Sequence, residues 1–398
     1  MDLGKISLLV FDVDSLLLGY ERPPEPNFVT TTNEEDEEEE PTLMRGLAKL
    51  IHHLYKRNVP MAGIISSANM SHFEGLCAMF NLCAMFNHTS DHVDYLAVAK
   101  ALESSVTTEE VLAVLSDTVS PGPAANSGIK FAILARIQTT KNEKEDCLQN
   151  GRTIFLHGAN ELTLESYNLP SFGYRRVTHV IFDVDGLLLD TVGMYGEALR
   201  KVLKRHGKKP SWEFRMSIMG MRREESLSKI IEFYSLPYTA EQLSDEFTRL
   251  TKKKISHADM MEGAERLVTH LHSREIPMAV ATSSMQESYE AKTVNHKEIF
   301  SKFHHIATGS HPDIECGKPA PDIFRICASL FEDNVEPGQC LVFEDAPNGV
   351  EAALAAGMQV VMVPDKRIPP DRLREATQLL YSLAEFQPED FGLPPFDV

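Results

Sequence analysis

The sequence predicts an α/β fold made of two Rossmann-like, doubly wound parallel sheets. Short apolar runs rich in β-branched and aromatic residues alternate with longer segments of helical spacing, a pattern typical of parallel strands joined by helices. Several of these runs end abruptly in polar residues, at the strand ends where open α/β sheets form their sites. The opening also repeats, because residues 6–18 (ISLLVFDVDSLLL) resemble residues 179–191 (HVIFDVDGLLLDT), and such internal similarity indicates duplication.

Composition supports two domains and excludes several classes of function. A chain of 398 residues is too long for one ordinary domain, and we expect domains at 1–172 and 173–398. The net charge of −19 argues against binding to nucleic acid or to an anionic membrane. None of the six cysteines forms a C-x-x-C pair, so neither a zinc site nor a disulfide framework is predicted. With free thiols, no signal peptide and no run of membrane-spanning length, we expect a cytoplasmic protein.

The first half continues the repeat with interruptions. The acidic run EEDEEEE at 34–40 predicts a solvated loop, and a docking tail for a basic partner is the alternative. The similarity returns at 59–74 (VPMAGIISSANMSHFE), which resembles 276–290 (IPMAVATSSMQESYE). The segment LCAMFN then occurs twice in succession within 76–87, and it suggests no function.

The second half opens on the most informative stretch of the chain, residues 180–186. The apolar run Val180–Phe182 predicts a strand buried on both faces, and it leads directly into Asp183, Val184 and Asp185. Two carboxylates at the end of a buried strand are costly unless a cation or a reaction uses them. Residues i and i+2 of a strand share a face, so the two carboxylates can address one ligand, and a glycine follows that lets the chain turn.

Residues 192–262 carry the apolar spacing of helices. We expect three amphipathic helices in this segment. Their apolar positions are Leu199, Val202 and Leu203, then Leu227, Ile230, Ile231 and Tyr234, then Leu243, Phe247 and Leu250. Because the segment is inserted between two strands of a sheet, these helices are predicted to form a small helical cap.

The remaining elements continue the alternation. Helices are expected at 262–276 and 319–331, with a short third one closed by Gly357. Apolar strands are expected at 277–284, 304–310, 340–346 and 359–365. The polar residues at their ends are, in chain order, Thr282, Ser283, Lys318, Glu344 and Asp345.

Four polar groups therefore stand beside apolar strands in a defined order. They are Asp183 with Asp185, Thr282 with Ser283, Lys318, and Glu344 with Asp345. Each group alone is ordinary chain punctuation. The ordered set resembles the four motifs of the haloacid dehalogenase superfamily of phosphatases over residues 177–398, and the helical insertion resembles its C1 cap. The resemblance implies a Mg²⁺-dependent phosphomonoester hydrolase that acts through an aspartyl-phosphate.

The resemblance also implies roles for the matching residues. Asp183 is expected to attack phosphorus, and Asp185 to act as general acid and base. Lys318, Thr282 and Ser283 are expected to bind the phosphoryl group. The expected Mg²⁺ ligands are Asp183, the backbone carbonyl of Asp185, Asp345 and Glu344.

A loop of the expected cap, residues 220–223, is a candidate for contacting the substrate. Arg222 and Arg223 are cations suited to a phosphate, and a solvated helix start that carries two cations is the alternative. The cap contacts decide which leaving group is accepted, so the sequence predicts only a small phosphorylated nucleoside or sugar as substrate.

Other interpretations compete with this one. A phosphosugar mutase of the same fold would need a bisphosphorylated activator. A scaffold without turnover is the non-enzymatic alternative, and the complete set of motifs argues against it. The histidines of the second half lack the spacing of a zinc site. Cys316 is expected to be inert rather than an activated thiol.

The first half is expected to be a capless and catalytically degenerate copy of the second. The residues at matching places are Asp12, Asp14, Ser66, Ser67 and Lys130, the last aligned with Lys318. Leu156 and His157 align with Glu344 and Asp345, which removes two carboxylates from a Mg²⁺ site. The stretch after Asp14 is also too short for a helical cap. We expect this half to pack against the catalytic half or against a protein partner.

Overall fold

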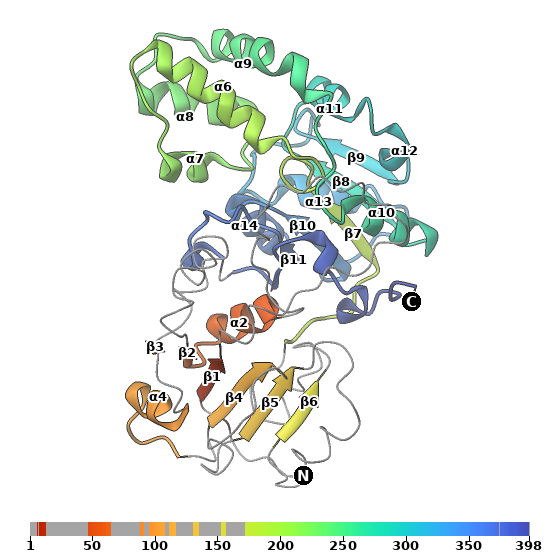
Figure 1. Cartoon of the computed structure of the whole chain (residues 1–398). Helices are drawn as coiled ribbons and strands as arrows, with labels where there is room; N and C mark the ends of the chain where they lie inside the picture. The colour runs from red at the N-terminus through yellow and green to blue at the C-terminus, as the bar shows by residue number, and fades with distance from the viewer. Residues whose placement is uncertain are drawn as a thin grey trace, which may run out of the picture. The chain divides into compact units, whose positions relative to one another are not determined.

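The computed structural model divides the chain into two compact units, residues 1–172 and 173–398 (Figure 1). It describes residues 6, 8–12, 47–64, 88–90, 95–107, 111–116, 130–134, 153–156, 172–373 and 375–397. Within these ranges, each unit holds a six-stranded sheet whose paired strands run parallel. The prediction of an α/β fold with parallel sheets is confirmed. None of the described helices has the length and apolar character needed to cross a membrane.

The sheet of the second unit has the order β12-β11-β10-β7-β8-β9. The chain runs outward from β7 to β9 and then returns to build the other side from β10. Its strands are β7 (His179–Phe182), β8 (Met278–Thr282), β9 (His305–Thr308), β10 (Cys340–Glu344), β11 (Gln359–Met362) and β12 (Gln378–Leu379). In such sheets, ligands bind where the strand order reverses, which here is the crevice between the ends of β7 and β10.

Continuous apolar sequence explains why the central strands are covered on both faces. All residues of β7, β8, β10 and β11 are buried, without the alternation of a half-exposed sheet. Phe182 and Phe343 stack across neighbouring strands with ring centroids 4.9 Å apart. The expectation that residues 359–365 form the last strand is wrong, because the two residues of β12 follow; so short a strand leaves no pattern in the sequence.

Helices accompany this sheet between its strands. They are α10 (Ala264–Ser273), α11 (Gln286–Thr293), α12 (Lys297–Phe300), α13 (Asp322–Ser329) and α14 (Pro347–Ala355), with 3-10 turns η6 (Pro337–Gln339), η7 (Pro370–Arg372), η8 (Leu383–Glu385) and η9 (Pro388–Phe391). Pro347 occupies the first turn of α14, where a missing N–H costs nothing.

Four helices occupy the segment predicted to form the cap, between β7 and β8, and they lie together beyond the sheet of the second unit (Figure 1). They are α6 (Val192–Arg205), α7 (Trp212–Ile218), α8 (Arg223–Tyr234) and α9 (Ala240–Ile255). The sequence indicated three of them and missed α7, a helix of seven residues without a fully buried side chain, whose Phe214 and Ile218 are only partly buried against the other cap helices. The cap has a hydrophobic core of its own, built around Leu199, Val202, Leu227, Ile230, Leu243 and Phe247.

The sheet of the first unit repeats the same strand order, β3-β2-β1-β4-β5-β6. Its strands are β1 (Leu8–Asp12), β2 (Met61–Ile64), β3 (His88–Ser90), β4 (Val111–Ser116), β5 (Lys130–Leu134) and β6 (Thr153–Leu156), with helices α2 (Leu47–Lys56) and α4 (Tyr95–Leu102). The acidic run, the LCAMFN repeat, Asp14, Ser66, Ser67 and His157 lie outside the described residues.

Strand order corrects the detailed alignment of the two halves. By position, the counterpart of β10 is β4, which pairs with β1. The sequence match instead chose residues 153–156, which form the edge strand β6. It also aligned Lys318 with Lys130, yet Lys130 starts a strand. Both equivalences are therefore wrong: short apolar runs of parallel strands resemble one another whichever strand they form.

Candidate active site

The carboxylates of the site stand where the two central strands end. The backbone N–H of Asp183 donates to the carbonyl of Phe343 at 3.0 Å, which holds Asp183 beside the end of β10. At Gly186 the chain turns with φ +91°, and a Cβ atom there would lie 2.3 Å from Asp345 Oδ2. Glycine permits both the turn and this approach, so Gly186 allows the two acidic strand ends to meet.

Lys318 lies fully buried beneath these carboxylates. Its Nζ donates to Asp183 Oδ1 at 2.7 Å, to Glu344 Oε1 at 2.5 Å and to the Ala281 carbonyl at 3.2 Å. Burial acts to lower the pKa of Lys318, but the carboxylates of Asp183 and Glu344 raise it above its usual value. The ammonium thus stays charged and bridges the ends of β7 and β10.

Glu344 is fixed from both sides. Its Oε2 accepts the backbone N–H groups of Asp345 and Ala346 at 3.1 and 3.2 Å, just before α14 begins. A Cβ atom on Gly349 would lie 2.0 Å from the Glu344 carboxyl group. A glycine in the first turn of α14 therefore leaves the space that this buried carboxylate occupies.

Asp183, Glu344 and Asp345 form a compact buried acidic cluster. One carboxylate oxygen from each lies within 4.8 Å of the others. Burial raises the pKa of Asp183 to about 7, with Lys318 opposing the rise and Glu344 adding to it, and burial also raises the pKa of Asp345 well above its usual value. One ammonium among three carboxylates leaves negative charge in excess. Oxygen ligands with excess negative charge suit a hard divalent cation, so this donor set fits Mg²⁺.

Asp185 is held apart from that cluster by other partners. Its carboxylate accepts Thr191 Oγ1 at 2.6 Å, Ser284 Oγ at 2.7 Å and Lys292 Nζ at 2.6 Å on both oxygens. Burial acts to raise the pKa of Asp185, but Lys292 and the hydrogen bonds outweigh it and hold the pKa below its usual value. Sequence reasoning missed Lys292, although it stands three residues after the buried Tyr289 on α11, a position where a lysine is unusual.

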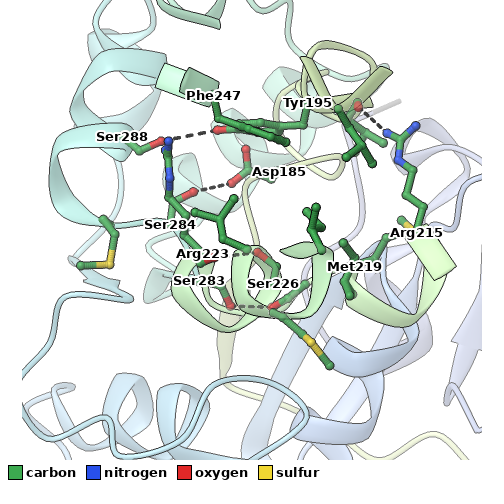
Figure 2. Close-up of a pocket in the computed structure, with 18 of the residues that line it drawn as sticks. Asp185, Tyr195, Arg215, Met219, Arg223, Ser226, Phe247, Ser283, Ser284 and Ser288 are labelled. Atoms are coloured by element: carbon green, nitrogen blue, oxygen red, sulfur yellow. Dashed lines mark hydrogen bonds between the residues drawn. The ribbon is translucent and has the colours of Figure 1, made fainter. Parts of the chain in front are cut away.

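The predicted phosphate-binding residues lie at the end of β8. Thr282 is buried, and its Oγ1 accepts the backbone N–H of Ser284 at 3.2 Å. The hydroxyl of Ser283 donates to the Gly220 carbonyl of the cap at 2.6 Å, and the hydroxyl of Ser284 reaches Asp185 (Figure 2). The structure thus brings the end of β8 to Asp185 and also connects it to the cap.

A cavity of about 200 Å³ lies between the cap and these strand ends (Figure 2). On the core side it is lined by Asp183, Asp185, Ser283, Ser284 and Asp345. The cap contributes mainly apolar and aromatic side chains, among them Tyr195, Leu199, Met219, Leu227, Ile230 and Phe247. The cavity is therefore acidic and polar where the motifs meet, and mainly apolar on the side of the cap.

The structure separates the two arginines predicted to contact substrate. Arg223 lines the cavity and donates to the Ser244 carbonyl and to Thr248 Oγ1, each at 2.7 Å. Arg222 is not among the lining residues and packs against Gly317, where a Cβ atom would lie 2.6 Å from Arg222 Cγ. A third arginine, Arg215, lines the cavity from α7. No pattern in the sequence pointed to it, because α7 itself was missed.

Comparison with known proteins shows which family the second unit resembles. Residues 180–363 match the haloacid dehalogenase-like hydrolase family. A probable pseudouridine-5'-phosphatase of Drosophila melanogaster is 46% identical, covering 56% of this chain and 96% of that protein. A (DL)-glycerol-3-phosphatase 2 of Arabidopsis thaliana is 42% identical, covering 56% of this chain and 95% of that protein. A solved β-phosphoglucomutase from Clostridium difficile is 27% identical with a TM-score of 0.46, covering 54% of this chain and 97% of the other.

The family match spans β7 to β11 and thus includes every strand whose end contributes to the site, together with the cap inserted between them. Identity of 46% over nearly the whole length of a relative extends the similarity beyond the motifs. The chain belongs to the haloacid dehalogenase-like hydrolases, among the phosphatases of that family.

Proposed function

We propose that this protein is a Mg²⁺-dependent phosphomonoesterase that works through an aspartyl-phosphate at Asp183, and that its substrate is pseudouridine 5′-phosphate. The observation that carries the reaction type is the buried contact of Lys318 with both Asp183 and Glu344, beside Asp345 at the point where the strand order reverses. A nucleophile, a cation and a metal site close together accelerate phosphoryl transfer, because positive charge stabilises the transferred group.

Asp183 supplies the nucleophile. Its carboxylate attacks phosphorus in line and forms a mixed anhydride, which water then hydrolyses. Asp185 gives a proton to the departing oxygen in the first step and takes one from water in the second. Both carboxylates line the cavity at the end of the same strand, so both can reach one bound phosphate ester.

The metal would be held by Asp183, Asp345 and the backbone carbonyl of Asp185, with Glu344 beside them. When bound, Mg²⁺ neutralises phosphate charge and orients the transferred group. Lys318 holds Asp183 in place and offers positive charge to a phosphoryl oxygen. Thr282, the backbone of Ser283, Arg222 and Arg223 complete the proposed set of phosphate and substrate contacts.

Two observations support a nucleoside as the leaving group. The relative at 46% identity is named for pseudouridine 5′-phosphate, and the cap side of the cavity is apolar and aromatic. A planar base gains from apolar and aromatic contacts, whereas a polyol would leave hydroxyl groups without partners there. The relative named for glycerol 3-phosphate, at 42% identity, makes that monoester the second candidate.

A phosphate-release screen tests the proposal. The chain is assayed with Mg²⁺ against pseudouridine 5′-phosphate, uridine 5′-phosphate, glycerol 3-phosphate and a set of sugar phosphates. We expect the highest kcat/KM with pseudouridine 5′-phosphate and no need for a bisphosphorylated activator. A preference for glycerol 3-phosphate would reject the proposed substrate but keep the reaction. Asp183→Asn should abolish release of phosphate from every monoester, and wild-type turnover by this variant would reject the mechanism.

We further propose that residues 1–172 form a non-catalytic copy of the domain at 173–398, with a binding rather than a chemical role. The same strand order in both sheets supports a common origin. Phe11 pairs with Val114 as Phe182 pairs with Phe343, so Leu115 follows at the level of Glu344 and Ser116 at the level of Asp345. The carboxylate pair is thus absent from the counterpart strand. The residues at the two positions are Leu115 and Ser116, not Leu156 and His157 as the sequence alignment suggested.

The first unit can be tested in the chain that carries Asp183→Asn. With Mg²⁺ and p-nitrophenyl phosphate, we expect no turnover. Turnover that disappears when Asp12→Asn is added would show a second working site and would reject a silent first unit.

A further inference from the structure

The Asp185 carboxylate is held by donors from three separate segments of the chain. Thr191 Oγ1 contacts Oδ1, Ser284 Oγ contacts Oδ2, and Lys292 Nζ lies 2.6 Å from both oxygens. An ionised carboxylate offers about four lone-pair sites, and these contacts reach both of its oxygens. Asp185 is thus fixed in direction while it faces the cavity.

Lys292 is the only charged member of these three donors, and its side chain is fully buried. Besides Asp185, the ammonium contacts Ser284 Oγ at 2.7 Å and lies 5.8 Å from the centre of the Tyr195 ring. A buried ammonium is costly unless it is paired. Its hydrogen bonds go to Asp185 and to the hydroxyl of Ser284, which also binds Asp185. The ammonium therefore holds Asp185 both directly and through Ser284.

We propose that Lys292 is a positioning residue that holds the Asp185 carboxylate toward the leaving group and keeps hold of it while that carboxylate exchanges a proton. The inference rests on the proposed function, because it needs Asp185 as the general acid and base. Lys292 itself touches neither the phosphate nor the metal in this scheme.

The two-oxygen contact explains why a lysine fits this task. In the first step, the bond between phosphorus and the leaving oxygen breaks as Asp183 bonds to phosphorus, and the proton on Asp185 moves to that oxygen. In the second step, water attacks phosphorus, the bond to Asp183 breaks, and Asp185 takes a proton from the water. While one oxygen carries the proton, the ammonium keeps its contact with the other, so the group does not turn away between the steps.

The test compares two leaving groups. An alkyl oxygen, as in pseudouridine 5′-phosphate or glycerol 3-phosphate, departs only with a proton, whereas p-nitrophenolate departs without one. The ratio kcat/KM reports the step in which the leaving group departs and not the later hydrolysis. General acid catalysis is worth roughly 10²–10⁴-fold, so Lys292→Met should lower kcat/KM by about 10²-fold with the alkyl substrate and by less than about threefold with p-nitrophenyl phosphate.

Two further variants complete the design. Lys297→Met, an exposed lysine on α12, is the matched control and should leave both substrates unaffected. In an Asp185→Asn background, adding Lys292→Met should change kcat/KM by less than about threefold, because residues that act as a unit are not additive. This double variant removes both buried charges together, so we expect it to fold. If Lys292→Met alone does not fold, Ser284→Ala must show the same dependence on the leaving group, in smaller degree.

The outcomes separate this inference from the proposed function. Equal losses with both leaving groups, or none, in Lys292→Met would overturn the positioning role, provided that Asp185→Asn shows the expected dependence. If Asp185→Asn shows no such dependence, the role proposed for Asp185 fails, and the inference fails with it. A wild-type chain that releases phosphate from no monoester rejects the proposed function itself.

Discussion

Lys318 Nζ lies 2.7 Å from Asp183 Oδ1, and both side chains are buried, so water cannot take the place of either charged partner. The side chain of Lys318 is 0% exposed and that of Asp183 is 7% exposed. Because the same ammonium also bonds Glu344, it links the two central strand ends. The residue proposed to act on phosphate is therefore also a structural centre of the second unit.

Removal of this lysine should cost stability as well as activity. Lys318→Met leaves buried carboxylates without their counter-charge, and breaking a buried pair costs about 3–5 kcal/mol. Denaturant unfolding followed by the single tryptophan, Trp212, reports on the second unit. Lys201→Met removes an exposed pair with Glu197 and should cost less than about 1 kcal/mol. Equal stability of both variants would contradict the assigned role of Lys318.

Removal of the metal should inactivate the enzyme reversibly. The buried cluster of Asp183, Glu344 and Asp345 carries excess negative charge, so we expect EDTA to abolish phosphate release and Mg²⁺ to restore it. Mg²⁺ should also raise the melting temperature without substrate, because a ligand of the folded state stabilises it. Asp345→Ala should weaken this thermal shift and raise the Mg²⁺ requirement. Full activity after thorough chelation would remove the metal from the mechanism.

The two cap arginines should behave differently. Arg223 lines the cavity and Arg222 packs on Gly317, so Arg223→Ala should raise KM by about tenfold or more, as expected for a lost hydrogen bond to a charged group. Arg222→Ala should change KM less. Steady-state kinetics with the best substrate of the screen measure both. The reverse order would show that Arg222 contacts substrate and that the described cap position is not the one that binds it.

Glu385 should make stability depend on pH. Burial raises its pKa to about 7, Glu262 adds to the rise, and a backbone hydrogen bond at Tyr381 opposes it. Between about pH 4.5 and 7 the unfolded chain releases this proton while the folded chain keeps it, so stability from this group falls as pH rises and then stays constant. Glu385→Gln should therefore raise stability at pH 8, by at most about 3 kcal/mol, and have no effect near pH 4.5.

The matched change for this prediction is Glu389→Gln, an exposed glutamate nearby, which should leave the melting temperature unchanged at both pH values. Tryptophan fluorescence during heating follows the second unit in each case. A gain for Glu385→Gln that is the same at pH 4.5 and pH 8 would show that its cause is not the proton.

The sequence predicted the site where a polar residue ends an apolar strand. Asp183, Thr282 and Glu344 stand in such places, and parallel strands bring their ends to one edge. Lys292 lies within a helix, where periodicity marks a buried face but does not say that a lysine on it has a partner. That partner, Asp185, lies 107 residues away in sequence, so only the fold could pair them.

In the first half, the sequence failed to predict the order of the strands. Its apolar runs indicate strands, but they do not say which strand takes which place in the sheet. Residues 153–156 resemble β10 in composition, yet they lie at the edge of their sheet. Order in a parallel sheet depends on the crossover connections and on packing over the whole unit, and neither is written in a run of four residues.

The separate hydrophobic core of the cap has a consequence for how such an enzyme diverges. Leu199, Ile230 and Phe247 belong to that core and also line the cavity, while the strands that end at Asp183 and Glu344 pack in a different core. A substitution among these cap residues reshapes the cap side of the cavity without disturbing the packing beneath Asp183. Substitutions confined to the cap can therefore change which phosphate ester fits the cavity, while the residues proposed for the reaction stay the same.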